Sequence, residues 1–176
     1  MESAKQVYIA SNGCNRRLLD ADRVRRYFLM NGWKITPSPK EADYNVFFAS
    51  ALNRIRIDES FDIITRLTRY SGETIVLGCL MEVAPTEFRE RWKGKFLAIK
   101  DMQEFDSFFP DFQHKYGEVP PGNTPARSGN IYKAVSPDVF LRQRLSLALN
   151  PVKLADKFYA HLHREQKENY DTTLSG

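Results

Sequence analysis

The feature that most constrains this chain is a regular alternation of strand-like and helix-like segments from residue 6 to about residue 100. Apolar, β-branched or aromatic runs are each followed by a turn signal and then by apolar residues at helical spacing. Such alternation predicts βαβ units, with parallel strands and helices on both faces of the sheet. We therefore expect an α/β fold, a doubly wound, mostly parallel, flavodoxin-like sheet. The expected strands are residues 6–10, 33–36, 44–49, 74–77 and 96–99.

Three helices are expected between these strands. The first has Asp20 as its N-cap and Gly32 just past its end, and the last begins with Pro85 at its first position. The middle helix is indicated by four apolar residues on one helical face. These are Ile57, Phe61, Ile64 and Leu67.

The pattern changes after residue 103. Residues 117–130 are rich in proline and glycine, which is typical of a loop or linker. Ser136-Pro137 and Asn150-Pro151 each resemble an N-cap followed by proline at the first helical position. They predict two helices, over 136–149 and 151–167. The predicted organisation is an α/β domain over 1–103, an irregular linker over 104–135 and a helical C-terminal extension over 136–176.

Composition excludes several classes of protein. The two cysteines, Cys14 and Cys79, cannot alone supply a four-cysteine metal site, a C-x3-C-x2-C radical motif or a disulfide framework. No apolar run reaches the ~18 residues that a membrane-spanning helix needs, and the N-terminus lacks the apolar region of a secretory signal. We therefore expect a cytoplasmic protein without a membrane partner. The formal net charge of +4 permits a nucleic-acid partner without requiring one.

Three short segments follow predicted strands and should meet at one edge of the sheet. They are Asn12-Gly13-Cys14-Asn15, Ala49-Ser50-Ala51 and Gly78-Cys79-Leu80. Ligands of open parallel sheets bind at the carboxyl ends of the strands, so we expect the two cysteines and the serine to converge there. A cysteine after a buried strand is usually a small buried hydrophobe. Two Gly-Cys steps at one edge leave that interpretation and a functional site both open.

Several motifs occur in a particular order and spacing along residues 6 to about 91. They are Val7-Tyr8-Ile9 through Gly13-Cys14, Asp20 six residues later, Gly32, Glu41-Ala42-Asp43, and Ile75-Val76-Leu77-Gly78-Cys79. Through them, residues 6 to about 91 resemble the N-terminal domain of the radical-SAM methylthiotransferases. That family adds methylthio groups to transfer RNA or to a ribosomal protein. The resemblance covers about half of the chain and implies a Rossmann-like α/β domain.

The resemblance implies an auxiliary 4Fe–4S iron–sulfur cluster held by three cysteines, of which Cys14 and Cys79 match. Ser50 stands at the position of the middle cysteine, after Phe48-Ala49 where the family has Asn-Thr, and Arg17 replaces a family asparagine. Because iron–sulfur clusters are held by thiolates, we expect a degenerate metal site and no firmly bound cluster. Natural divergence and a deliberate Cys→Ser change are both open explanations, and the altered Asn-Thr context favours divergence.

The resemblance also implies a radical-SAM catalytic domain that carries S-adenosylmethionine and a 4Fe–4S cluster of its own. Residues 100–176 do not match that domain. We therefore expect either the N-terminal part of a larger transferase or a stand-alone relative, inactive by itself and serving as a substrate-facing or scaffold domain. Its expected partner is a radical-SAM catalytic domain, in the same chain or in another one.

A second function is open, a non-enzymatic binding module for RNA or another anionic ligand. Arg16 and Arg17 lie beside Cys14 and could contact phosphate, although a solvated helix face is the simpler explanation. A flavodoxin-like cofactor domain is a third possibility, but no phosphate-cradling loop supports it. The candidate binding residues are Asn12, Asn15, Arg16, Arg17 and Ser50.

Overall fold

The computed structural model describes residues 5–13, 15–121 and 132–133, which lie in the first of two units, Met1–Ser136 and Pro137–Gly176. The central sheet is parallel throughout, with the strand order β2-β1-β3-β4-β5. This is the flavodoxin-like order, so the predicted fold class is confirmed. Strand bounds are β1 (Gln6–Ser11), β2 (Lys34–Ile35), β3 (Tyr44–Ala49), β4 (Glu73–Gly78), β5 (Lys95–Ala98) and β6 (Tyr132–Lys133).

The short strand β6 pairs with the carboxyl end of β1, in parallel, at Ala10 and Ser11. Strand β2 pairs with β1 only at Gln6 and Val7. Strand β1 thus has one neighbour, β3, along most of its length, and two short neighbours at its opposite ends. The carboxyl end of β1 is enclosed from both sides for this reason.

The three expected helices are present between the strands, with the short helix α3 in addition, but the first helix starts elsewhere than predicted. The first helix begins at Asn15 rather than at Asp20. Asp20 does not cap the helix but forms an ion pair with Arg17, at 3.0 Å, and the buried face begins with Arg17 and continues through Ala21 and Val24. Helix bounds are α1 (Asn15–Met30), α2 (Arg54–Leu67), α3 (Leu80–Val83), α4 (Pro85–Arg91) and the 3-10 helices η1 (Ile99–Phe108) and η2 (Tyr116–Glu118).

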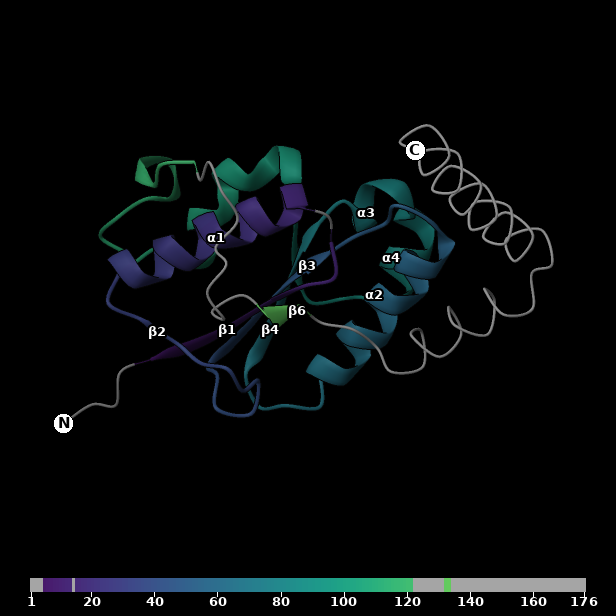
Figure 1. The fold of residues 1–176 in the computed structure, drawn as a ribbon, viewed down its shortest axis with the longest axis horizontal. Coiled ribbons are helices and arrows are strands. Elements are labelled where there is room, and N and C mark those ends of the chain that lie inside the picture. The colour runs from purple at the N-terminus through teal and green to yellow at the C-terminus, as the bar shows by residue number, and fades with distance from the viewer. Residues whose placement is uncertain (1–4, 14, 122–131, 134–176) are drawn as a thin grey trace, which may run out of the picture. The chain divides into compact units, whose positions relative to one another are not determined.

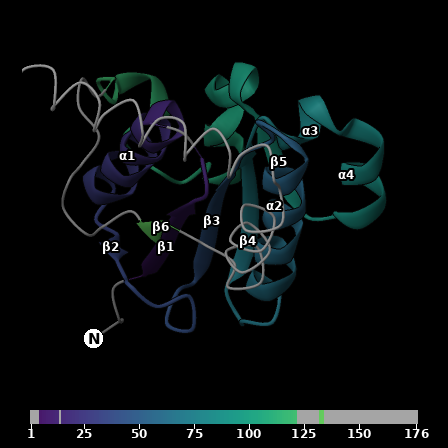
Figure 2. The same cartoon turned by 45° about the vertical axis from the view of Figure 1, so that its right-hand side comes forward.

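The helices cover both faces of the sheet, as Figure 1 and Figure 2 show for α1 on one side and α2 on the other. Alternation along β3 produces the two cores. Val46 and Phe48 pack with α1 and η1, whereas Phe47 and Ala49 pack with α2, α3 and α4. The predicted apolar face of α2 is buried in the second core, which confirms that prediction.

Residues 99–119 belong to the first core. Phe105, Phe109 and Tyr116 are buried there among the rings of α1. The Tyr27 hydroxyl donates a hydrogen bond of 2.8 Å to Asp106, and the Tyr116 amide donates another to the same carboxylate. Helix η1 therefore runs across the position where the predicted α/β domain ends. The domain boundaries stay a prediction.

The two helices predicted over 136–149 and 151–167 lie outside the described residues. Within the part of the chain that is described, no helix has the length and apolar character to cross a membrane.

Candidate functional site

Strand β4 ends at the candidate site with Gly78, a position where any other residue would strain the backbone. Gly78 has a φ of +130°, and a Cβ added there would lie 2.2 Å from the Ala49 carbonyl oxygen. The close approach lets the Cys79 amide donate a hydrogen bond of 3.2 Å to that oxygen. The ends of β3 and β4 are thereby held side by side.

Cys79 and Ser50 lie on these two neighbouring strand ends. The Cys79 Sγ atom accepts a hydrogen bond of 3.4 Å from the backbone amide of Ala51, the residue after Ser50. Cys79 is half-buried and Ser50 is buried. Cys14 lies outside the described residues, so the convergence of all three side chains stays a prediction.

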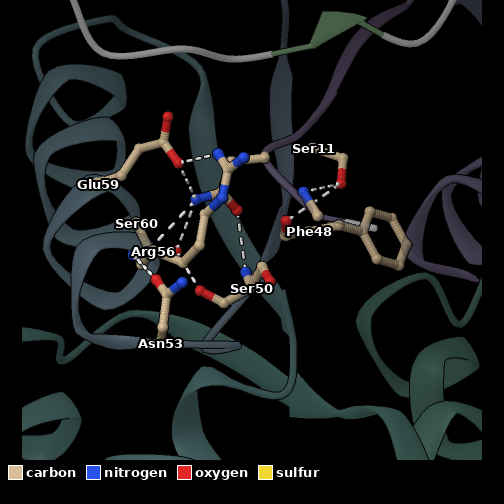
Figure 3. A network of polar contacts seen from close by, with 9 residues as sticks. Ser11, Phe48, Ser50, Asn53, Arg56, Glu59 and Ser60 are labelled. Atoms are coloured by element: carbon tan, nitrogen blue, oxygen red, sulfur yellow. Dashed lines mark hydrogen bonds and ion pairs between the residues drawn. The ribbon is translucent and has the colours of Figure 1, made fainter. Parts of the chain in front are cut away.

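Asn12 occupies the centre of the site rather than its surface. Its side chain is buried, and its Oδ1 atom accepts a hydrogen bond of 2.9 Å from the Ser50 amide. Its Nδ2 atom donates to Ser60 Oγ at 3.0 Å and to Glu59 Oε2 at 3.2 Å. Ser60 Oγ in turn donates to the Ser50 carbonyl oxygen at 2.9 Å. Figure 3 shows these contacts joining the ends of β1 and β3 to α2.

A buried carboxylate lies in the same network. Glu59 is 1% exposed, and its Oε2 atom also pairs with the Arg56 guanidinium. Among the described residues, Glu59 Oε1 has no hydrogen-bond partner. Asn53 caps α2 by accepting a hydrogen bond of 3.0 Å from the Arg56 amide, so Asn53 and Glu59 hold the first turns of α2 together.

The two predicted cationic binding residues, Arg16 and Arg17, differ in burial. Arg16 is exposed, whereas Arg17 is buried and paired with Asp20. A Cβ added at Gly13 would lie 2.5 Å from Arg17 Cβ, so the stem of Arg17 fills the space under the turn after β1. Burial raises the pKa of the Asp20 carboxyl, although Arg17 and Arg16 lower it. Asn15 is the first residue of α1.

The sequence interpretation missed Arg56, Glu59 and Ser60. A signal was present for Ser60, because it lies three residues after Ile57 and thus falls within the apolar face of α2. A small polar residue in an apolar face indicates a buried hydrogen-bond partner.

The arrangement places the Cys79 thiol and the Ser50 hydroxyl on one rim of the sheet, formed by the carboxyl ends of β3 and β4. Within the described ranges, which exclude Cys14, no group of three His, Cys, Asp or Glu side chains could hold a metal ion.

Comparison with known proteins finds a family and a set of enzymes. Residues 6–98 match the family described as "Uncharacterized protein family UPF0004". Over 120 residues, or 68% of this chain, the sequence is 28% identical to the ribosomal protein uS12 methylthiotransferases RimO of Xanthomonas campestris, Xanthomonas axonopodis and Stenotrophomonas maltophilia. The match covers 25% of each enzyme. The chain therefore spans about a quarter of the length of the curated relatives it matches.

Proposed function

The chain belongs to the family UPF0004, the N-terminal domain of the methylthiotransferases, and from this premise we propose that it serves a radical-SAM methylthiotransferase-like enzyme as a substrate-facing or scaffold domain. The observation that carries the proposal is the extent of the family match, which begins and ends with the sheet from β1 to β5. The adjacent strand ends that carry Ser50 and Cys79 support it.

The donor set at the site does not fit a 4Fe–4S cluster held by three thiolates. Ser50 offers a hydroxyl oxygen at the position of the middle cysteine, and a hydroxyl binds iron only after losing its proton. Two cysteines leave a further iron without a soft protein ligand. The site proposed at Cys14 and Cys79 is accordingly a degenerate cluster site, and the chain alone has no turnover.

The chemistry of the proposed enzyme belongs to another domain. A radical-SAM domain, in the same chain or in a partner, would hold S-adenosylmethionine and its own 4Fe–4S cluster. In that assembly, which we place in the cytoplasm, the rim around Ser50 and Cys79 would face the substrate. The relatives are named for action on ribosomal protein uS12, and a protein substrate of this kind is one that such a rim could face.

A second candidate is a non-enzymatic module that binds RNA or another anionic ligand. The exposed position of Arg16 at the start of α1 favours it, because an exposed guanidinium can contact phosphate. Arg17 supports it less, since its charge is paired with Asp20.

Two binding measurements separate these functions. The first function predicts a stable complex between this chain and the radical-SAM domain of a RimO relative, detected by size-exclusion chromatography with light scattering. The second predicts binding of single-stranded RNA by the isolated chain, weakened by Arg16→Ala. Arg16→Ala should leave the protein complex unchanged. RNA binding that depends on Arg16, without any protein complex, would replace the first function by the second.

A further inference from the structure

The peptide groups on both sides of the Ser50 side chain are held by side chains from other elements. Its amide donates to Asn12 Oδ1 at the end of β1, and its carbonyl oxygen accepts from Ser60 Oγ on α2, each at 2.9 Å. A turn that follows a strand usually has its backbone groups in water or paired locally. The turn after β3 is instead tied to two other parts of the chain.

The residues that hold Ser50 are themselves joined and shielded from water. Asn12 Nδ2 donates to Ser60 Oγ and to Glu59 Oε2, which closes a ring of contacts around the turn. Asn12 and Glu59 are each 1% exposed and Ser60 is fully buried. Hydrogen bonds in so dry an environment are strong, and opening one of them leaves a buried polar group unpaired.

Fixing Ser50 also fixes the next residue against β4. The Ala51 amide donates to Cys79 Sγ at 3.4 Å, and the Cys79 amide donates to the Ala49 carbonyl oxygen at 3.2 Å. Hydrogen bonds of the protein itself therefore connect the ends of β1, β3 and β4 and α2. The resemblance to the methylthiotransferases implies that the cluster cysteines lie on these same three strand ends.

We propose that Asn12, Ser60 and Glu59 act as a clamp that holds the Ser50 turn in its site-forming shape in place of a third metal–thiolate bond. The proposal rests on the proposed function, because it takes Ser50 to stand where a cluster ligand stands in the methylthiotransferases. Asn12, Ser60 and Glu59 are positioning residues in this view. They touch the Ser50 backbone or one another.

The clamp predicts how the turn behaves in protein that holds no iron. The turn must keep its shape in iron-free protein, and loss of the clamp must loosen the turn before it loosens the sheet. Amide hydrogen exchange of the full chain, followed by NMR in the presence of EDTA, measures both. We expect the Ser50 and Ala51 amides to be protected in the iron-free wild-type protein to the same order as the amides of β3.

Two variants remove the clamp, and one matched variant leaves it intact. Asn12→Leu keeps the side-chain size without its hydrogen bonds, and Ser60→Ala removes one hydroxyl. Each should speed exchange at Ser50 and Ala51 about tenfold relative to β3, the loss expected for a buried hydrogen bond. Asn53→Ala removes a side-chain amide at the N-cap of α2, and this amide does not touch Ser50. It should leave the ratio of exchange rates between the turn and β3 unchanged.

Three results would overturn the clamp. The first is unprotected exchange of the Ser50 amide in iron-free wild-type protein. The second is a gain of protection at this amide when iron and sulfide are added. The third is an equal effect of Asn53→Ala and Ser60→Ala on the exchange rates of the turn. The wild-type comparison needs no variant, so it decides the question even if Asn12→Leu does not fold. Iron and sulfide content of the same samples tests the degenerate site separately. A bound cluster together with unchanged protection of the Ser50 amide would contradict the assignment of a degenerate site but not the clamp.

Discussion

The side-chain oxygen of Asn12 accepts a hydrogen bond from the Ser50 amide at 2.9 Å, although 38 positions separate the two residues in the sequence. The bond joins the ends of β1 and β3, which are the strands on either side of the point where the strand order reverses. Ligands of doubly wound folds bind at such a point. Ser50 is therefore fixed through its backbone at the place where doubly wound folds bind their ligands.

Substitution of Gly78 should destabilise the protein more than substitution of Gly32 or Gly117. Gly78→Ala forces a side chain onto a φ of +130° and places its Cβ against the Ala49 carbonyl oxygen. We expect the free energy of unfolding to fall by about 2–5 kcal/mol, from backbone strain and from the clash together. Urea denaturation followed by circular dichroism measures this change.

Two other glycines serve as controls for that change. Gly32 has a φ of +78° but open space around it, so Gly32→Ala should cost only about 1–2 kcal/mol for the backbone conformation. Gly117 has open space and no positive φ, so Gly117→Ala should change stability by about 0.5 kcal/mol or less. Equal effects at Gly78 and Gly117 would show that the close approach of β4 to Ala49 is not required.

Arg17 and its neighbour Arg16 should differ sharply on substitution. Arg17→Ala removes a buried stem under Gly13 and leaves Asp20 without its ion-pair partner, so we expect a loss of about 1–3 kcal/mol at neutral pH. Arg16→Ala alters an exposed side chain and should cost about 0.5 kcal/mol or less.

The loss caused by Arg17→Ala should depend on pH. Burial already raises the pKa of Asp20 above its ordinary value of 3.8, and removing Arg17 takes away the largest opposing effect. A carboxyl whose folded pKa is raised destabilises the fold above that pKa and not below 3.8. The deficit should therefore shrink as the pH falls from neutral toward 3.8. A deficit that grows on acidification would contradict the assigned role of Asp20.

The tyrosines of the first core should make the protein sensitive to alkali. Burial raises the pKa of Tyr27, Tyr44 and Tyr116 above the ordinary value of 10.0, and donation to Asp106 raises that of Tyr27 further. Each stays neutral in the folded state while the unfolded chain ionises, so the stability they provide is present below pH 10.0 and is lost as the pH rises above it.

Ultraviolet absorbance of tyrosinate and circular dichroism, recorded on the same samples, check this expectation. We expect part of the tyrosine titration to coincide with loss of the native circular dichroism signal. The variant Tyr27→Phe removes one of the groups that resist ionisation and should move the unfolding to higher pH. Ionisation of all eight tyrosines near pH 10.0 in the intact fold would contradict the expected link between tyrosine ionisation and unfolding.

Local signals in the sequence account for most of the fold. The strand Tyr44–Ala49 was predicted to the residue because an apolar run there stops sharply at both ends. The start of α1 was wrong because Asp20, a good N-cap by type, is instead held inside the helix by Arg17. Side-chain pairing of this kind depends on burial, which a local motif does not reveal.

The site was less predictable than the fold. Order along the chain was enough to place Ser50 and Cys79 on neighbouring strand ends. The contacts of Asn12 with Ser50 and Ser60 span 38 and 48 positions, and no local pattern predicts such pairs. The packing of residues 99–119 could have been inferred, because Phe105, Phe109, Phe112 and Tyr116 recur at intervals of three or four residues.

The most direct test of the degenerate site is the iron and sulfide content of the wild-type chain after anaerobic reconstitution, beside Ser50→Cys. Ser50→Cys exchanges oxygen for sulfur on a turn already held in place, so it offers a third thiolate with little change in packing. We expect little or no 4Fe–4S cluster in the wild-type protein, and any recovered cluster to be seen in the variant by electron paramagnetic resonance after reduction. A near-stoichiometric 4Fe–4S cluster in the wild-type protein would contradict the account.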